Sequence, residues 1–148
     1  MYNNIDDNIT VTERGWGGHW ICGSRCMYHR NTLISYNEKK IIVSTIGRYK
    51  PAVSDPEYCL HLIAGFESLG GGGVEGNRYY ETEIGFAEFN SGYWEYSPDK
   101  EIYHNLLMEY QCKISRLDPS FFDSDRFADE YHDKCVQKVI DLLKENKL

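Results

Sequence analysis

No long hydrophobic run occurs in the 148-residue sequence. No stretch approaches the ~20 consecutive apolar residues that a membrane-spanning helix needs, so we expect no membrane partner. The first seven residues, Met1–Asp7, are polar and acidic and lack the apolar core of a secretory signal peptide. The five cysteines are odd in number and scattered along the chain, which favours free thiols in a reducing cytoplasm over a disulfide framework.

Basic residues are also scarce, with 16 Lys and Arg against 23 Asp and Glu and a formal net charge of −7. The acidic excess is confined to residues 79–148, which hold eight basic and fifteen acidic residues, whereas residues 1–78 hold eight of each. Duplex nucleic acid attracts a basic face that releases counterions, so this balance excludes a partner of that kind. This charge distribution still allows a local cationic pocket built from residues 1–78.

The composition is typical of one globular domain. Hydrophobic residues make up 41% of the chain and charged residues 26%, which excludes a disordered chain. A domain of this length buries about 68–70% of its unfolded surface, so it folds without a disulfide or metal. Residues 1–14 are polar and predict a loose lead-in, and residues 15–148 predict a single α+β domain that binds a ligand. The twelve tyrosines favour strands and binding surfaces.

Alternating side chains predict a β-hairpin over residues 26–46. Residues 40–46 are rich in β-branched side chains, and residues 37–39 predict the turn. The period of two places Tyr28, Arg30, Thr32 and Ile34 on one face of the first strand, and Met27, His29, Asn31 and Leu33 on the other. A further strand is predicted over residues 79–89, followed by a hairpin turn at residues 90–92.

Helical signals are confined to the last third of the chain. Ser97 and Pro98 are typical of a helix start, although residues 102–108 can also continue a strand. Residues 123–125 predict the start of a long helix. Its apolar stripe is Phe127, Tyr131, Cys135, Val139 and Leu142, flanked by Val136, Ile140 and Leu143. Together these signals predict an α+β fold, with an antiparallel β-sheet in the N-terminal two-thirds and a C-terminal α-helix packed on it.

One set of residues has the chemistry of a metal site but not its spacing. His19, Cys22, Cys26 and His29 offer zinc-type ligands, yet all four fall within eleven consecutive residues. A strand would also direct Cys26 and His29 to opposite faces. The bland alternative is a pair of small buried thiols near a turn, and we expect no metal.

Motifs for catalysis are equally weak. Gly70–Gly73 follows a short strand predicted over residues 58–64, but it lacks the Lys-Ser/Thr and the helix of a phosphate loop. Glu81 and Glu83 share one strand face, where exposed glutamates are far commoner than acid–base pairs. We therefore expect no catalytic residues and no cofactor.

Two clusters combine guanidinium, aromatic and amide or hydroxyl groups, at residues 25–32 and 77–82. Arginine matches phosphate oxygens in pairs, and an aromatic ring stacked on a nucleobase contributes about 1–3 kcal/mol. The candidate ligand-binding residues are Arg25, Tyr28, Arg30, Asn31, Thr32, Arg78, Tyr79, Tyr80 and Thr82. The alternative is that Arg30 and Arg78 only pair with the carboxylates of residues 79–148.

The same residues carry a resemblance to a known family. The segments concerned are Gly17–Cys22, Arg25–Leu33, Ile42–Gly47 and Arg78–Thr82, with His132 in a late helix. In these segments the chain resembles the phage anti-Thoeris proteins of the first described type. The likeness covers most of residues 15–96, and the chain departs from the family pattern around residues 51–73 and 103–122.

The resemblance implies a sponge that acts in the host bacterial cytoplasm. Members of that family sequester cyclic ADP-ribose signals made by bacterial immune enzymes, leave them intact, and form homo-oligomers with pockets near subunit interfaces. It therefore implies a non-enzymatic protein whose ligand is a cyclic ADP-ribose isomer or a cyclic oligonucleotide. On this view Arg30→Ala or Arg78→Ala abolishes binding with little loss of stability. The alternative is a protein-directed inhibitor of a host defence complex, of anti-CRISPR or anti-restriction type, that uses the acidic residues 79–148.

Overall fold

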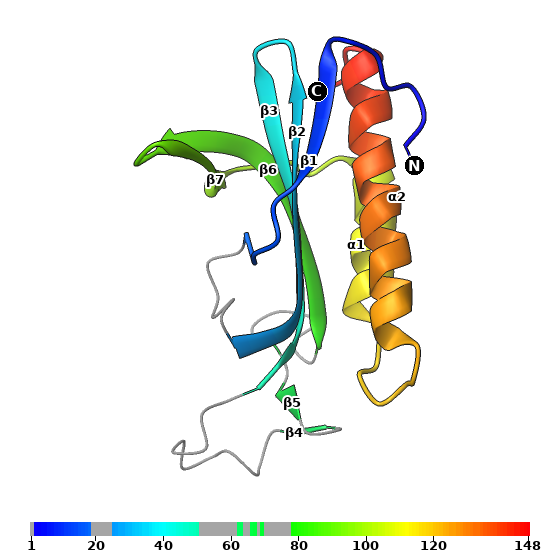
Figure 1. Ribbon diagram of the computed structural model, residues 1–148. Helices are drawn as coiled ribbons and strands as arrows, with labels where there is room; N and C mark the ends of the chain where they lie inside the picture. The colour runs from blue at the N-terminus through cyan, green and yellow to red at the C-terminus, as the bar shows by residue number, and fades with distance from the viewer. Residues whose placement is uncertain (1, 19–24, 51–61, 64–65, 68, 70–77) are drawn as a thin grey trace.

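A computed structural model of the protein describes residues 2–18, 25–50, 62–63, 66–67, 69 and 78–148. The strands are β1 (Ile9–Glu13), β2 (Cys26–Tyr36), β3 (Lys39–Tyr49), β4 (Leu62–Ile63), β5 (Phe66–Glu67), β6 (Tyr80–Asn90) and β7 (Tyr93–Glu101), and the helices are α1 (Asn105–Ser115) and α2 (Ser124–Lys144). All strands precede the helices along the chain (Figure 1), which confirms the predicted α+β layout. Neither helix is both long and apolar enough to span a membrane.

The strands pair in antiparallel fashion around β3. On one side β3 pairs with β2, and on the other it pairs with β6 over most of its length and with β5 at Tyr49. β1 adds to the outer edge of β2, and β7 to that of β6. The two predicted hairpins are confirmed, with the left-handed conformations of their turns at Asn37 (φ 55°) and at Ser91 and Gly92 (φ 52° and 94°).

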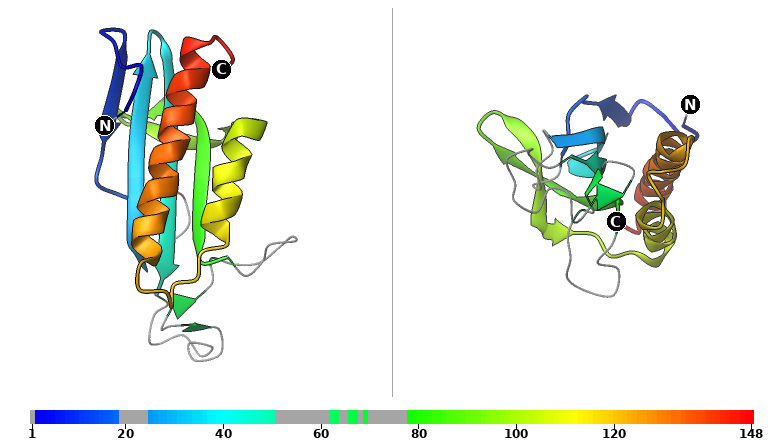
Figure 2. Two further views of the ribbon diagram at one scale, coloured as in Figure 1. Left: turned by 90° about the vertical axis from the view of Figure 1, so that its right-hand side faces the viewer. Right: turned by 90° about the horizontal axis from the view of Figure 1, so that it is seen from below.

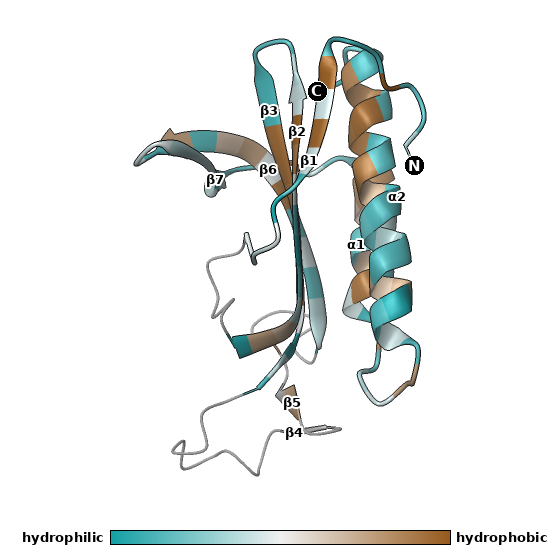
Figure 3. Cartoon of the chain, viewed as in Figure 1, coloured by the Kyte–Doolittle hydropathy of each residue, from teal (hydrophilic) through white to brown (hydrophobic). Residues whose placement is uncertain are grey.

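Both helices cover the same face of the sheet, so the molecule has two layers (Figures 1 and 2). The main core lies between these layers. Its fully buried members include Ile34, Ile41, Val43, Ile84, Val136, Val139 and Leu143. Figure 3 shows that the C-terminal half of α2 is apolar towards the sheet, whereas its N-terminal half is largely hydrophilic. The helix is therefore anchored by apolar packing at one end and by polar contacts at the other.

No described helix lies on the opposite side of the sheet, which we call the open face (Figure 2). A small cluster covers part of it, built by Ile42, Ala87 and Tyr96 with Leu33 and Trp94 at its margin. The β6–β7 hairpin curls towards this side (Figure 1). The sheet thus presents a concave surface on the open face that is formed by strands alone among the described elements.

Three local predictions need correction. Residues 9–13, assigned to the loose lead-in, form β1, because alternating β-branched side chains suit an edge strand. Ser97 and Pro98 lie in β7 rather than at a helix start, and α1 instead begins after His104, whose side chain accepts from the Leu106 amide.

The apolar stripe of α2 is correct only in its C-terminal half. Cys135, Val136, Val139 and Ile140 are buried as predicted, but in the first turns Ala128 and His132 are buried. The predicted Phe127 is exposed and Tyr131 half-buried. The buried residues follow one continuous face of the helix. His132 lies on that face, and because it is polar the hydrophobic pattern did not include it.

The segment before β1 is tied to α2. The Tyr2 hydroxyl donates to Asp133 (2.9 Å), and the Asn3 amide donates to Gln137 Oε1 (2.7 Å). Asn4 Nδ2 donates to Asp141 Oδ1 (3.1 Å). These contacts join residues more than 130 positions apart, as their separations of 131, 134 and 137 show.

Candidate functional site

A chain of buried polar side chains lies between the sheet and α2. His132 is fully buried, with Nε2 2.8 Å from Thr32 Oγ1 and Nδ1 2.7 Å from Thr45 Oγ1. Thr45 Oγ1 in turn lies 2.6 Å from Thr82 Oγ1. At the other end the Thr32 hydroxyl donates to Glu13 Oε2 (2.7 Å). Every polar atom of the imidazole therefore has a partner.

This chain has one consistent direction of donation. A carboxylate only accepts, so the Thr32 hydroxyl donates its one proton to Glu13. It can then only accept from Nε2–H of His132. Nδ1 then carries no proton and accepts from the Thr45 hydroxyl. Burial, aided by the positive charge of Arg30, lowers the pKa of His132 and keeps the ring neutral.

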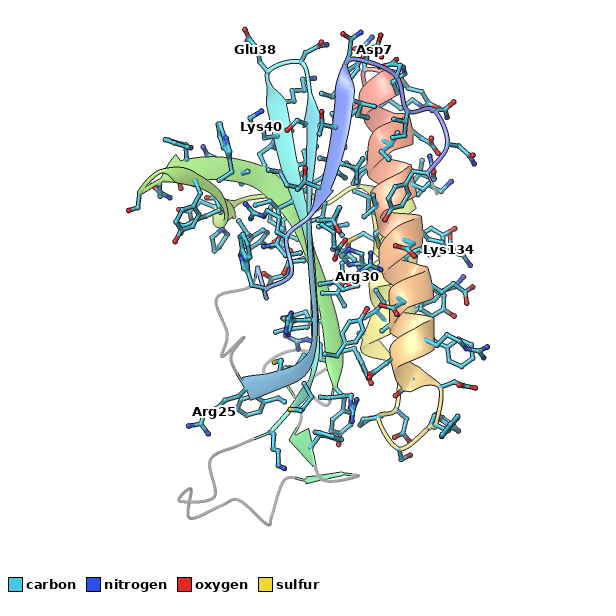
Figure 4. All side chains as sticks on the ribbon, in the orientation of Figure 1. Asp7, Arg25, Arg30, Glu38, Lys40 and Lys134 are labelled. Carbon is cyan, nitrogen blue, oxygen red and sulfur yellow. The ribbon has the colours of Figure 1, made fainter. Side chains whose placement is uncertain are left out.

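Arg30, a candidate ligand-binding residue, is held by three carboxylates at one end of this chain. Its guanidinium bonds both oxygens of Glu13 (3.1 and 3.0 Å) and lies 2.9 Å from Asp133 and 3.6 Å from Asp129. Burial alone would lower the pKa of Arg30, but the bond to Glu13 and the charge of Asp133 outweigh it and raise that pKa. Figure 4 places Arg30 between the sheet and α2. Its charge is thus engaged within the protein.

Two predicted tyrosines are also occupied beneath α2. Tyr28 donates to Asp129 (2.7 Å). Tyr80, which is fully buried, donates to Asp125 (2.9 Å) and accepts from the Ser124 hydroxyl (2.8 Å). Burial, and then the bond to Asp129, raises the pKa of Tyr28. These phenols hold the polar N-terminal half of α2 on the sheet, where apolar packing is sparse.

Three predicted residues, Arg25, Arg78 and Tyr79, do not join the polar chain. Arg78 forms an ion pair with Glu81 at 2.5 Å. Together with Thr82 it lines a cavity of about 170 Å³ that also contains Glu81, Glu83 and Glu101, a set poorly suited to an anion. Tyr79 is half-buried against the cluster around Tyr28 and Tyr80. Arg25 is exposed and extends away from the helices (Figure 4).

Asn31 alone among the predicted residues lies on the open face, as strand alternation requires. It lines a cavity of about 380 Å³ that we call the open-face pocket. The described lining residues are Arg14, Trp16, Gly17, Gly18, Asn31, Tyr93, Glu95 and Tyr96. The pocket thus joins the end of β1, the middle of β2 and the start of β7.

Sequence reasoning missed the lining residues other than Asn31, because they come from three separate segments. Arg14 follows a strand that was assigned to the lead-in, and Trp16 precedes a glycine pair. The one available signal was compositional: an arginine and a tryptophan two residues apart, followed by a glycine pair.

Two polar atoms at the pocket lack partners. Asn31 is 0% exposed, and its Nδ2 has no hydrogen-bond partner in the described part of the chain. The same holds for Nε of Arg14, which is buried. The other Arg14 contacts orient its guanidinium: Nη1 donates to the Trp94 carbonyl (2.5 Å), Nη2 to Asn31 Oδ1 (3.4 Å), and the group lies 4.9 Å from the Trp16 ring centre. Buried donors without acceptors are rare, and each calls for a partner such as an ordered water, an ion or a ligand.

Gly18 is needed where the chain passes over Asn31. Its amide donates to Ser44 Oγ (3.0 Å), and a Cβ at this position would lie 2.8 Å from Asn31 Nδ2 and 2.9 Å from Ser44 Oγ. Both neighbours are fully buried, so neither can move away freely. The backbone therefore approaches the pocket floor as closely as a side-chain-free residue allows.

We expect Gly18→Ala to lower the free energy of unfolding by about 1–3 kcal/mol, the usual effect of overpacking a buried site. Chemical denaturation measures it. In an Asn31→Ala background, which removes one of the two clashing groups, the same change should cost less. Equal losses in both backgrounds would contradict the close contact with Asn31.

Several predictions concern residues outside the described ranges. His19 and Cys22 of the metal-like set and the Gly70–Gly73 loop lie there, as does the 58–64 strand except for Leu62–Ile63, which form β4. Cys26 is buried and His29 exposed, in keeping with opposite faces. Within the described ranges, no three His, Cys, Asp or Glu residues are grouped to hold a metal.

The fold and the pocket define a two-layer α+β protein with a polar cavity on the open face of its sheet. Comparison with known proteins finds no matching family model, no matching curated protein and no matching solved structure. The function must therefore be argued from the pocket and from the sequence.

Proposed function

We propose that the protein binds a small nucleotide-type ligand in the open-face pocket and holds it without cleavage, as a sponge for a cyclic ADP-ribose-type immune signal. The family resemblance suggests the ligand, and the pocket suggests where it binds. The cavity of about 380 Å³ falls within the ~300–1,000 Å³ of small-molecule sites. A sponge must also outcompete the effector of the signal, which calls for nanomolar affinity, about −12 kcal/mol.

The observation that carries the proposal is the amide nitrogen of Asn31, which has no acceptor among the described residues and lies in the same pocket as Trp16 and Tyr93. A ligand acceptor placed on its buried Nδ2 would restore a hydrogen bond worth about 0.5–1.5 kcal/mol. Trp16 is 49% exposed and Tyr93 52% exposed, so part of each ring is open to a ligand. A nucleobase stacked on such a ring gains about 1–3 kcal/mol.

The chemistry of the lining supports retention of the ligand over its cleavage. Hydrolysis of a glycosidic bond uses a pair of carboxylates, and phosphoanhydride hydrolysis uses a metal or a positioned base. Among the described lining residues Glu95 is the one carboxylate, and none is His, Cys, Ser or Lys. This set can bind and orient a ligand, but it offers no acid–base pair.

The competing idea of an acidic surface that mimics nucleic acid has less support. Several of its carboxylates are neutralised by cations of the same chain. Arg30 forms ion pairs with Asp129 and Asp133, Arg48 with Asp125, and Arg78 with Glu81. A mimic needs negative charges that are free to meet a partner, and these four are paired with arginines of the same chain.

Calorimetric titration with a panel of cyclic ADP-ribose isomers and cyclic oligonucleotides tests the proposal. We expect one member to bind with nanomolar affinity and to be recovered unmodified after the protein is denatured. Recovery of a hydrolysed product would indicate an enzyme instead. Capture of one stoichiometric host protein without nucleotide affinity would select the protein-directed inhibitor. Light scattering of the same sample tests the homo-oligomer that the resemblance implies.

Asn31→Ala tests the place of the ligand. We expect about tenfold weaker binding, the equivalent of about 1.4 kcal/mol, because the buried donor to the ligand is lost. The free energy of unfolding should fall by only about 1 kcal/mol, because the variant loses the bond from Arg14 to Oδ1 but also removes a donor without an acceptor among the described residues. His29→Ala is the matched control, because it lies on the same face of β2 outside the described lining. Equal affinity in the two variants would place the ligand elsewhere.

A further inference from the structure

The positive charge in the open-face pocket is already balanced. Burial lowers the pKa of Arg14, and the charge of Glu95 acts against that effect, so the two groups lie close enough to interact. Both line the cavity. One arginine and one glutamate leave no net charge among the described lining residues.

Two of the five N–H groups of Arg14 are already used within the protein. Its Nη1 donates to the Trp94 carbonyl and its Nη2 to Asn31 Oδ1. A guanidinium that binds a phosphate uses two parallel N–H groups on one edge. The two existing bonds restrict how Arg14 can present such an edge, and Glu95, which lines the same pocket, would repel a phosphate there.

From this balance we infer that the open-face pocket takes the neutral nucleoside part of its ligand, base and ribose, and leaves the phosphates outside at the mouth. The inference rests on the proposed function and specifies which end of the nucleotide is recognised. It differs from the role that sequence reasoning gave to arginine, which was to bind the pyrophosphate.

The polar groups of the pocket suit a nucleoside. Asn31 Nδ2 is a donor without an acceptor in the described ranges, and the Glu95 carboxylate is an acceptor. A nucleobase presents acceptors and N–H donors side by side along its edge, and ribose hydroxyls do both. Trp16 and Tyr93 supply flat surfaces beside them. A phosphate offers acceptors alone, so it could add no hydrogen bond to the Glu95 carboxylate, which already accepts from Asn90 Nδ2 (3.4 Å).

Competition calorimetry tests the inference with three probes: cyclic ADP-ribose, adenosine and inorganic pyrophosphate. We expect adenosine to displace cyclic ADP-ribose and pyrophosphate at tenfold higher concentration to leave it bound. Displacement by pyrophosphate but not by adenosine would overturn the inference while leaving the proposed function intact. Failure of both cyclic ADP-ribose and adenosine to bind would overturn the two together.

Glu95→Gln gives a second readout that depends on the sign of the effect. If the pocket holds the nucleoside, losing the charged acceptor should weaken cyclic ADP-ribose binding about three- to tenfold. If it holds the pyrophosphate, removing a negative charge should strengthen binding instead. Glu38→Gln is the control, because it changes the net charge equally at the exposed β2–β3 turn, away from the described lining (Figure 4). Tighter binding specific to Glu95→Gln would refute the inference.

Discussion

Replacing Arg30 with methionine is expected to lower the free energy of unfolding by about 3 kcal/mol. Removing one partner of a buried ion pair costs about 3–5 kcal/mol, and the lower end applies because the Arg30 side chain is 21% exposed. Methionine keeps most of the apolar stem, so the loss reports the charge. It would leave Glu13 and Asp133 facing each other without a cation. Chemical denaturation measures the change.

The control is Lys113→Met, which removes an ion pair with Glu109 on the surface of α1. Exposed pairs of this kind contribute about 0.3–0.5 kcal/mol, so the variant should be nearly as stable as the wild type. The Arg30 expectation reverses the one drawn from sequence, which was loss of binding with little loss of stability. A stable Arg30→Met protein that no longer binds its ligand would restore that earlier view.

Replacing His132 with leucine should remove much of the protein's sensitivity to mild acid. The pKa of His132 is lowered in the folded state, chiefly by burial, whereas in the unfolded chain it is about 6.5. Below pH 6.5 the unfolded state therefore binds a proton that the folded state does not. The wild type should lose up to about 1.4 kcal/mol of stability for each pH unit below 6.5, and the variant should not lose this share.

At neutral pH the same variant should be less stable than the wild type by about 1–3 kcal/mol, since two hydrogen bonds of the ring are lost. Denaturation at pH 7.5 and pH 5 should therefore show the gap between the two proteins shrinking as the pH falls. The titration of Glu13 does not contribute to the change in stability between pH 7.5 and pH 5. Burial alone would raise its pKa, but bonds from Arg30 and Thr32 lower it below its usual 4.5, so its contribution is lost only at lower pH. A constant gap would show that the ring takes up its proton in the folded state.

The strands could be predicted because their signals are local. β2 and β6 alternate along part of their length, β3 is rich in β-branched residues, and their turns carry residues that adopt a left-handed backbone. The helix start predicted at Pro98 was wrong because the pairing of β7 with β6 allows a proline there. Pro98 lies in β7 where the pairing with β6 shifts register, between Tyr96 and Glu101, so its missing N–H breaks no registered pair there.

The candidate site could be predicted only in part. Strand alternation already placed Asn31 on the opposite face from Tyr28, Arg30 and Thr32, so those residues could not line one pocket. Arg30 could be recognised as a charge but not as one with partners, because Asp129 and Asp133 come from a helix a hundred residues later. The open-face pocket is formed by residues from segments that are far apart in the sequence. No short sequence motif could therefore predict it.

The hydrogen bonds between residues 2–4 and α2 bear on how the chain can fold. Residues 2–4 are synthesised long before the helix that they bind, because their partners lie 131, 134 and 137 positions later in the chain. The sheet can assemble during synthesis, but the packing of α2 and its hydrogen bonds to residues 2–4 must wait until residues 124–144 have been made. A nascent chain stalled before residue 124 should therefore expose the apolar side of its sheet, where a chaperone would find it.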